Sequence, residues 1–142
     1  MTNKLKQLLN LFFEAVSFDA GYQPAYERIY PLFIESGLLI KNSGETPEIS
    51  SVRQFIEPRQ ALVNSGVLTR FHEVEISATT DVFGNIAHRF SVYAKSGTQK
   101  GVAFEAKGVI STQFVRTSNG WKISSMAWDD EREGLKILNN MP

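Results

Sequence analysis

The stretch from Ile86 to Trp128, IAHRFSVYAKSGTQKGVAFEAKGVISTQFVRTSNGWKISSMAW, decides the fold. Apolar and polar side chains alternate along it, and short turn-rich segments interrupt the alternation at residues 96–98 and 118–120. A period of two indicates strands with one buried face, and short turns favour antiparallel pairing of neighbours. Residues 68–80 alternate in the same way. Together the two stretches predict a four-strand meander over residues 68–80, 86–94, 102–116 and 121–128.

The N-terminal part of the chain has the periodicity of helices instead. A stripe with helical spacing runs from Leu5 to Val16, and Gly21 is a natural stop after it. A second, shorter helix is expected from Pro24, and it should end or kink at Tyr30 because a proline follows. Residues 38–40 predict a short strand.

A third helix is expected between this short strand and the meander. Ser51 and Gln54 have the spacing of a capping box, and Gly66 marks the end of the apolar pattern that follows. Helices followed by consecutive hairpins predict an α+β fold in which about three helices cover one face of an antiparallel sheet. We expect one domain over residues 1–142.

Side chains alternate between the two faces of a strand, so odd or even residue numbers predict which side chains lie under the helices. The mostly apolar set is even-numbered in the first three strands of the meander and odd-numbered in the fourth. His72, His88 and Thr112 share this parity, so they are expected to face the helices. The opposite, outer face should carry Tyr93, Ser111, Gln113, Met126 and Trp128. Apolar and aromatic side chains mixed with polar ones mark a contact surface, which predicts a homodimer joined there.

Composition excludes several classes of function. The chain has no cysteine, and its 15 basic and 15 acidic residues are scattered. Disulfides and thiolate metal sites are therefore excluded, and nucleic acid and anionic membranes are not expected as partners. No apolar run is long enough to span a bilayer, and no cleavage site follows the apolar N-terminal stretch closely. We expect a cytoplasmic protein without a bound metal or cofactor.

Four stretches resemble a known superfamily: residues 17–40, 87–93, 108–113 and 120–128, the last together with Glu131. Their order and motifs are similar to those of the nuclear transport factor 2-like proteins, SnoaL-like domains included, and most similar to small bacterial proteins of unassigned function. The resemblance implies a cone-shaped curved sheet and a small-molecule ligand. It also implies a homodimer, since domains of this fold commonly pair sheet to sheet. If the protein is an enzyme, the resemblance implies acid–base chemistry without a cofactor, of the isomerase, cyclase or dehydratase type. The alternative is a non-catalytic dimerisation or assembly module with a filled core.

Two residues are candidates for such chemistry. His88 has the pKa range that suits proton transfer near neutrality, and its alternative is a hydrogen-bonded core histidine. Asp129 ends the last strand, where SnoaL-like cyclases use an acidic residue; its alternative is a solvated charge. The interior parity and the helical aromatics predict the ligand-binding residues Tyr26, Tyr30, Phe55, His72, Phe90, Ile110 and Thr112.

Overall fold

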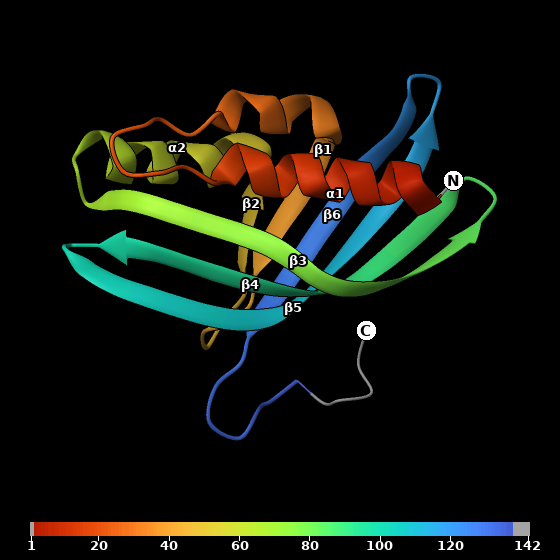
Figure 1. The fold of residues 1–142 in the computed structure, drawn as a ribbon. Coiled ribbons are helices and arrows are strands. Elements are labelled where there is room, and N and C mark those ends of the chain that lie inside the picture. Colours follow the sequence, from red (N-terminus) through yellow and green to blue (C-terminus); the bar gives the residue numbers. More distant parts are fainter. Residues whose placement is uncertain (1, 138–142) are drawn as a thin grey trace.

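The computed structural model describes residues 2–137 and has two layers (Figure 1). One layer is a strongly curved, open sheet of six strands, and the other contains α1 (Thr2–Val16), the 3₁₀ helix η1 (Tyr26–Leu32) and α2 (Val52–Asn64). The strands are β1 (Phe33–Lys41), β2 (Glu48–Ser51), β3 (Leu68–Phe83), β4 (Ile86–Gln99), β5 (Val102–Thr117) and β6 (Gly120–Asp130). The predicted α+β class, with three helices on a curved sheet, is confirmed.

The helices begin and end largely where the sequence predicts. Ser51 Oγ accepts a hydrogen bond from the Gln54 backbone, and the Gln54 side chain accepts one from the Ser51 backbone, so the capping box that opens α2 is present. The second helix is a 3₁₀ helix that includes Pro31 and continues to Leu32, two residues beyond the predicted end. Short 3₁₀ helices are common as connectors, and Pro31 lies one residue before the end of this one.

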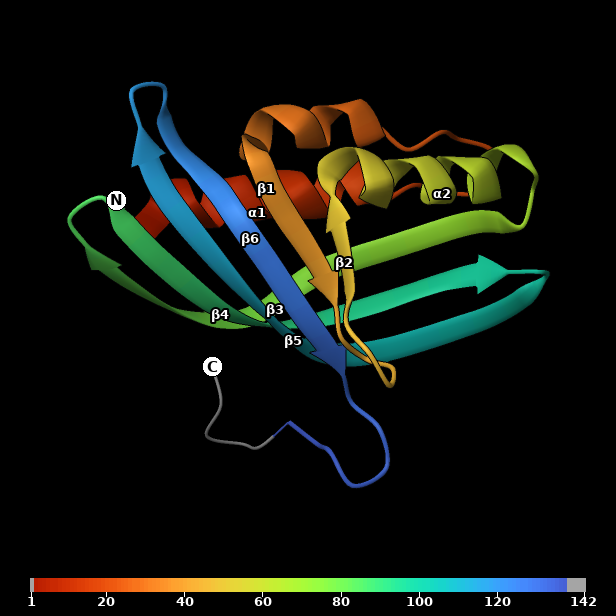
Figure 2. The same cartoon turned by 180° about the vertical axis from the view of Figure 1, so that it is seen from behind.

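The sheet has the order β2-β1-β6-β5-β4-β3 (Figure 2). Strands β3 to β6 form the predicted antiparallel meander. β1 then lies parallel to β6 and carries β2 on its other edge. The short strand predicted at residues 38–40 lies in the C-terminal half of the nine-residue β1, and β2 is a strand that the sequence had not predicted.

The predicted orientation of β4 is wrong, because the turn that precedes β5 lies elsewhere. We call the sheet surface that faces the helices the inner face. The turn consists of Lys100 and Gly101, both with positive φ, and Gln99 pairs directly with Val102. Positive φ at both central residues is the geometry of a tight hairpin turn, so β4 continues through the segment 96–98 that was predicted to be the turn. Odd residues of β4 therefore face inward.

A second irregularity changes parity within β6. A bulge interrupts the β5–β6 pairing at Gln113 and Phe114, after which Met126 pairs with Thr112 and Trp128 with Ile110. An extra residue in one strand moves all later side chains to the opposite face. Met126 and Trp128, predicted on the outer face, consequently point inward. Tyr93, also predicted on the outer face, points inward as an odd residue of β4. Ser111 and Gln113 are exposed, as an outer position requires.

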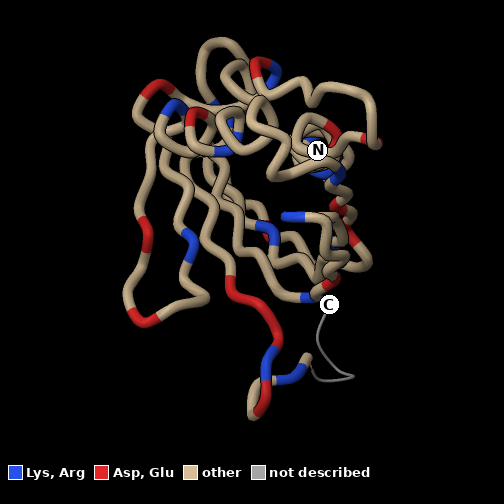
Figure 3. The backbone as a smooth tube through the Cα atoms, turned by 90° about the vertical axis from the view of Figure 1, so that its left-hand side faces the viewer, with Lys and Arg blue, Asp and Glu red and all other residues tan. Residues whose placement is uncertain are grey.

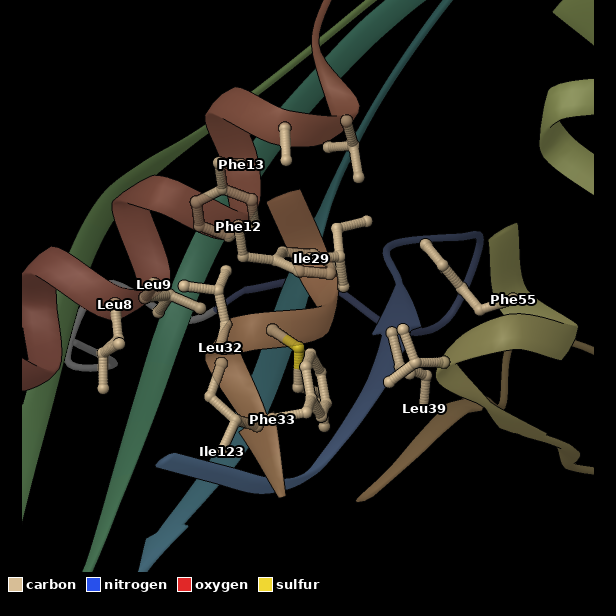
Figure 4. Packing of buried hydrophobic residues seen from close by; sticks show 14 of the residues in the cluster. Leu8, Leu9, Phe12, Phe13, Ile29, Leu32, Phe33, Leu39, Phe55 and Ile123 are labelled. Carbon is tan, nitrogen blue, oxygen red and sulfur yellow. The ribbon is translucent and has the colours of Figure 1, made fainter. Parts of the chain in front are cut away.

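The core fills one part of the space between the layers. Figure 4 shows side chains of α1, η1 and β1 meeting Ile123 of β6. Phe12 of α1 is buried and has ring contacts with Phe13, Phe33 and Phe55 at centroid distances of 5.8–6.3 Å. Charged residues of both signs are interspersed on both layers (Figure 3).

A buried ion pair lies on the inner face of β3 and β4, where the sequence predicted outward-facing side chains. Arg89 donates two hydrogen bonds to the Glu75 carboxylate, at 2.9 and 2.7 Å, and a third to Thr80. Ser91 donates to the same carboxylate at 2.7 Å. The side chains of Arg89 and Glu75 are only 9% and 6% exposed. These hydrogen bonds outweigh the effect of burial and lower the pKa of Glu75.

Replacing Arg89 should therefore destabilise the fold, whereas replacing its neighbour should not. Arg89→Met leaves Glu75 buried without its partner, which should cost about 3–5 kcal/mol. His88→Met changes an outer residue whose side chain is 62% exposed and should stay within about 0.5 kcal/mol. Urea unfolding followed by circular dichroism measures both. The reverse order of effects would place His88 inside, contrary to the structure.

Candidate functional site

A cavity of about 340 Å³ lies between α2 and the inner face of the sheet. Every strand except β2 contributes to its wall, as do all three helices. The strand residues come from the half of the meander nearest the β4–β5 turn. The lining residues are Phe12, Val16, Tyr26, Lys41, Phe55, Pro58, Arg59, Leu62, Leu68, Phe71, Glu73, Lys95, Gln99, Phe104, Ile110 and Trp128.

Aromatic side chains form much of the wall. Phe55 meets the ring of Trp128 edge to face, with centroids 6.0 Å apart and an interplanar angle of 88°. Phe71 and Phe104, also in the wall, have ring centroids 6.3 Å apart. Gly97 permits this arrangement, because a Cβ there would approach the Phe104 ring to 2.6 Å. The wall therefore offers flat apolar surfaces to a molecule in the cavity.

Glu73 of β3 is the acidic residue of the wall. Its backbone N–H donates to Ser17 Oγ at 3.1 Å, and Lys95 lies opposite it on β4. Burial raises the pKa of the Glu73 carboxyl to about 7, although the nearby Lys95 ammonium opposes the shift. Within residues 2–137 its carboxylate has no hydrogen-bond partner. A group with this pKa can exchange a proton near neutrality.

A network behind Glu73 holds Lys95 in place. The Tyr93 hydroxyl donates a short hydrogen bond to the Asp130 carboxylate, and Lys95 Nζ lies 3.1 Å from the same group. Burial and the hydrogen bond to Asp130 both raise the pKa of Tyr93, so its hydroxyl stays protonated. Gly108 makes the arrangement possible, because any Cβ there would collide with the Tyr93 hydroxyl and the Asp129 carbonyl.

Three further polar groups surround the cavity. The Arg59 guanidinium stacks on Phe55, 3.6 Å from its ring centroid, and donates to the Phe55 carbonyl at 2.9 Å. Burial lowers the pKa of Arg59, and burial also raises that of Tyr26 in spite of the nearby guanidinium. Lys41, at the end of β1, is half-buried in the wall.

The two catalytic candidates from the sequence lie outside this cavity. His88 projects from the outer face with an exposed side chain and pairs with Asp81, with His88 Nε2 3.0 Å from the carboxylate. The prediction that it faces the interior is wrong, since it rests on the parity that His88 shares with Ile86 and Phe90, which are themselves exposed. Asp129 is 38% exposed and forms an ion pair with Arg132. This contact matches its alternative interpretation as a surface charge.

The structure separates the predicted ligand-binding residues into two groups. Tyr26, Phe55 and Ile110 line the cavity, and their role in ligand binding stays a prediction. The other four residues lie elsewhere: Tyr30 is exposed, His72 pairs with Asp19 at 2.7 Å, Phe90 lies on the outer face, and Thr112 is fully buried in the core with an unpaired hydroxyl.

Sequence reasoning missed Glu73, Lys95 and Arg59. All three lie on elements that were predicted, but the parity assigned to β3 and β4 placed the first of them outside. The Lys100-Gly101 dipeptide was the available signal, because a glycine directly before an apolar strand start favours a two-residue hairpin turn.

Among residues 2–137, no group of three or more His, Asp or Glu side chains is arranged to hold a metal ion. None of the helices in that range is long and apolar enough to cross a membrane.

Comparison with known proteins identifies the fold. No protein-family profile and no curated protein matches the chain. Among solved structures, a nuclear transport factor 2-like superfamily protein from Salmonella enterica has a TM-score of 0.73 at 14% identity, covering 100% of this chain and 99% of that one. An NTF2-like protein from Cytophaga hutchinsonii has a TM-score of 0.71 at 12% identity, covering 92% and 98%.

A third neighbour carries a name with a function. A Streptomyces avermitilis protein of the NTF2-like family, provisionally named a dehydratase, has a TM-score of 0.69 at 14% identity and covers 92% of this chain and 95% of its own. At such identities the likeness establishes the nuclear transport factor 2-like, cystatin-like fold. The predicted resemblance is therefore confirmed at the level of fold.

The environment of Glu73 makes a direct prediction. In a titration followed by carboxyl ¹³C NMR, Glu73 should have a pKa of about 7, and Lys95→Met should raise it further by removing the nearby positive charge. Glu75, two residues away, serves as the internal reference because its pKa is lowered. An ordinary pKa for Glu73 in both proteins would show that water reaches it freely.

Proposed function

We propose that this protein binds a small organic molecule in the cavity between α2 and the sheet. The observation that carries the proposal is the cavity itself, which combines an aromatic wall with a few inward-facing polar groups. Its volume of about 340 Å³ falls within the usual range for ligand sites. A module that serves only for assembly has no use for such a space, so the cavity favours binding over the alternative.

Proton transfer to or from the ligand is the chemistry that the cavity supports. Glu73 faces the space with a pKa of about 7, which leaves both its acid and its base form populated near neutrality. Lys95 lies opposite and can stabilise negative charge that develops nearby. The dehydratase name of the Streptomyces neighbour is compatible with this chemistry. We therefore assign to Glu73 the role of acid–base group that the sequence had suggested for His88.

Filling the cavity should abolish binding. Leu62 lines the cavity from α2, whereas Ala61 next to it is exposed. The neutral fluorescent probe N-phenyl-1-naphthylamine should bind the wild-type protein, and Leu62→Trp should weaken this binding at least tenfold by occupying the space. Ala61→Trp is the matched control and should bind the probe normally. Equal binding by both variants would show that the probe lies elsewhere.

The outer face supports a second proposal, pairing of two copies of this chain. Large apolar side chains are exposed along the outer face of β3 and β4: Val74, Ile76, Ile86 and Phe90. Ser111 and Gln113 continue this surface on β5. Apolar residues with polar neighbours are the usual composition of a contact surface. Three residues of the original interface prediction, Tyr93, Met126 and Trp128, are no longer part of it.

The end of the chain bears on this surface as well. The alternative to pairing is that the segment after β6, residues 134–142, folds back over the outer face of its own chain. Leu135 is exposed, and its backbone pairs with that of Arg132 in a tight turn. The backbone N–H of Ile137 donates a hydrogen bond to the Glu131 carboxylate. These contacts leave Ile76 and Phe90 exposed. Leu138, which belongs to this segment, lies outside the described residues.

The expected cytoplasmic location stays a prediction.

Sedimentation tests the pairing. At micromolar concentration the wild-type protein should have twice the chain mass of 15.9 kDa. Phe90→Glu should shift it to the single mass, because the carboxylate would be buried in the interface without a partner. Val102→Glu, at an exposed position beside the β4–β5 turn, is the control and should leave the dimer intact. A wild-type protein of single mass would contradict the proposal.

A further inference from the structure

We propose that the ligand of the cavity is a small organic anion, with its charged group against Arg59 and Lys41 and a flat apolar body along the aromatic wall. This inference rests on the proposed function, since it names the chemical class that the same cavity would accept. It depends on the state of the two cations, on the shape of the wall and on the charges around Glu73.

Arg59 has hydrogen-bonding capacity to spare. Of the contacts in residues 2–137, its guanidinium makes one, the bond from Nη1 to the Phe55 carbonyl, and no carboxylate lies within 4.0 Å of it. Arg89, by contrast, is fully engaged by Glu75 and Thr80. Stacking on Phe55 fixes the plane of the Arg59 guanidinium. A fixed, partly desolvated guanidinium is suited to bind a carboxylate through two parallel hydrogen bonds.

Lys41 supplies a second cation in the wall. Within the described range its ammonium group has no ion-pair partner. The nearest acidic position across the β1–β2 ladder is Glu48, which is exposed to solvent and also lies near Arg59. Because its charge is screened by water, Glu48 neutralises neither cation fully. Lys95, the third cation of the wall, is already paired with Asp130. The wall thus leaves positive charge uncompensated, and a bound anion would neutralise it.

Glu73 links this preference to pH. The charged or titratable groups around it are Lys95 and Tyr93 from β4, Asp130 from β6 and Arg59 from α2. An ionised Glu73 would repel a bound anion, whereas the protonated carboxyl can donate a hydrogen bond to it. Binding of the anion should therefore favour the protonated form, and affinity should fall as pH rises through about 7.

Three naphthalene compounds of similar shape test the charge preference: 1-naphthoate, the neutral 1-naphthamide and the cationic 1-naphthylmethylammonium. Each is used to displace N-phenyl-1-naphthylamine, and displacement is measured by fluorescence. We expect 1-naphthoate to bind at least tenfold more tightly than the other two. Arg59→Gln should weaken its binding about 10- to 100-fold, the loss expected for hydrogen bonds to a charged group, and should leave 1-naphthamide unchanged. Arg53→Gln, on the exposed side of the same helix, is the matched control and should change neither.

A pH series completes the test. Between pH 6 and 8 the affinity of 1-naphthoate should fall by up to tenfold per unit above pH 7, and Glu73→Gln should remove this dependence. If 1-naphthamide or the ammonium compound binds as tightly as 1-naphthoate, or if only the fluorescent probe binds, the anion inference is wrong while the cavity remains a binding site. If the probe does not bind either, the proposed function fails with it.

Discussion

The register of β4 against its two neighbours is the constraint on which the inner face depends. β4 pairs with β3 on one side and with β5 on the other, and each pairing is closed by a two-residue turn. Because side chains alternate between faces, a shift of one residue would bring His88 inside and expel Arg89, Ser91 and Tyr93. The positive φ of Lys100 and Gly101 thus determines, from the tip of the hairpin, which groups the interior contains.

The inner face that results contains two carboxylates with opposite properties. Glu73 and Glu75 lie two residues apart on β3 and point to the same side. Glu75 accepts hydrogen bonds from Arg89 and Ser91, which lower its pKa, whereas Glu73 borders the cavity and has its pKa raised to about 7 by burial. Environments that separate the pKa values of similar groups are typical of acid–base sites. The sheet therefore carries one structural carboxylate and one that can exchange a proton.

The sequence predicted the fold more completely than the site. Helical spacing, the Ser51 capping box and the alternation from Ile86 onward were enough for the element order, because each is a local signal. The faces of β4 and of the second half of β6 depend on a turn and a bulge, which alternation alone does not locate. Tyr26, Phe55 and Ile110 line the cavity as expected. The first two lie on the predicted apolar faces of their helices, and the even residues of β5 face inward as predicted. Glu73 was not, since β3 changes parity at its own bulge near Glu75.

Folding alone does not explain why a carboxyl group is found at position 73. Its raised pKa means that the folded chain retains a proton which the unfolded chain releases above its usual value of 4.5. Stability attributable to this group is therefore fully present below about pH 4.5 and is lost as pH rises towards 7. An apolar residue would fit the aromatic wall without this loss, as replacements of buried charges in other proteins show. Local violations of this kind are concentrated at functional sites, where stability is exchanged for chemistry. Glu75 needs no such explanation, because Arg89 compensates its charge. Among the inner-face carboxylates of β3, Glu73 is thus the one whose charge no ion pair of the described residues compensates, which is what the proposed acid–base role expects.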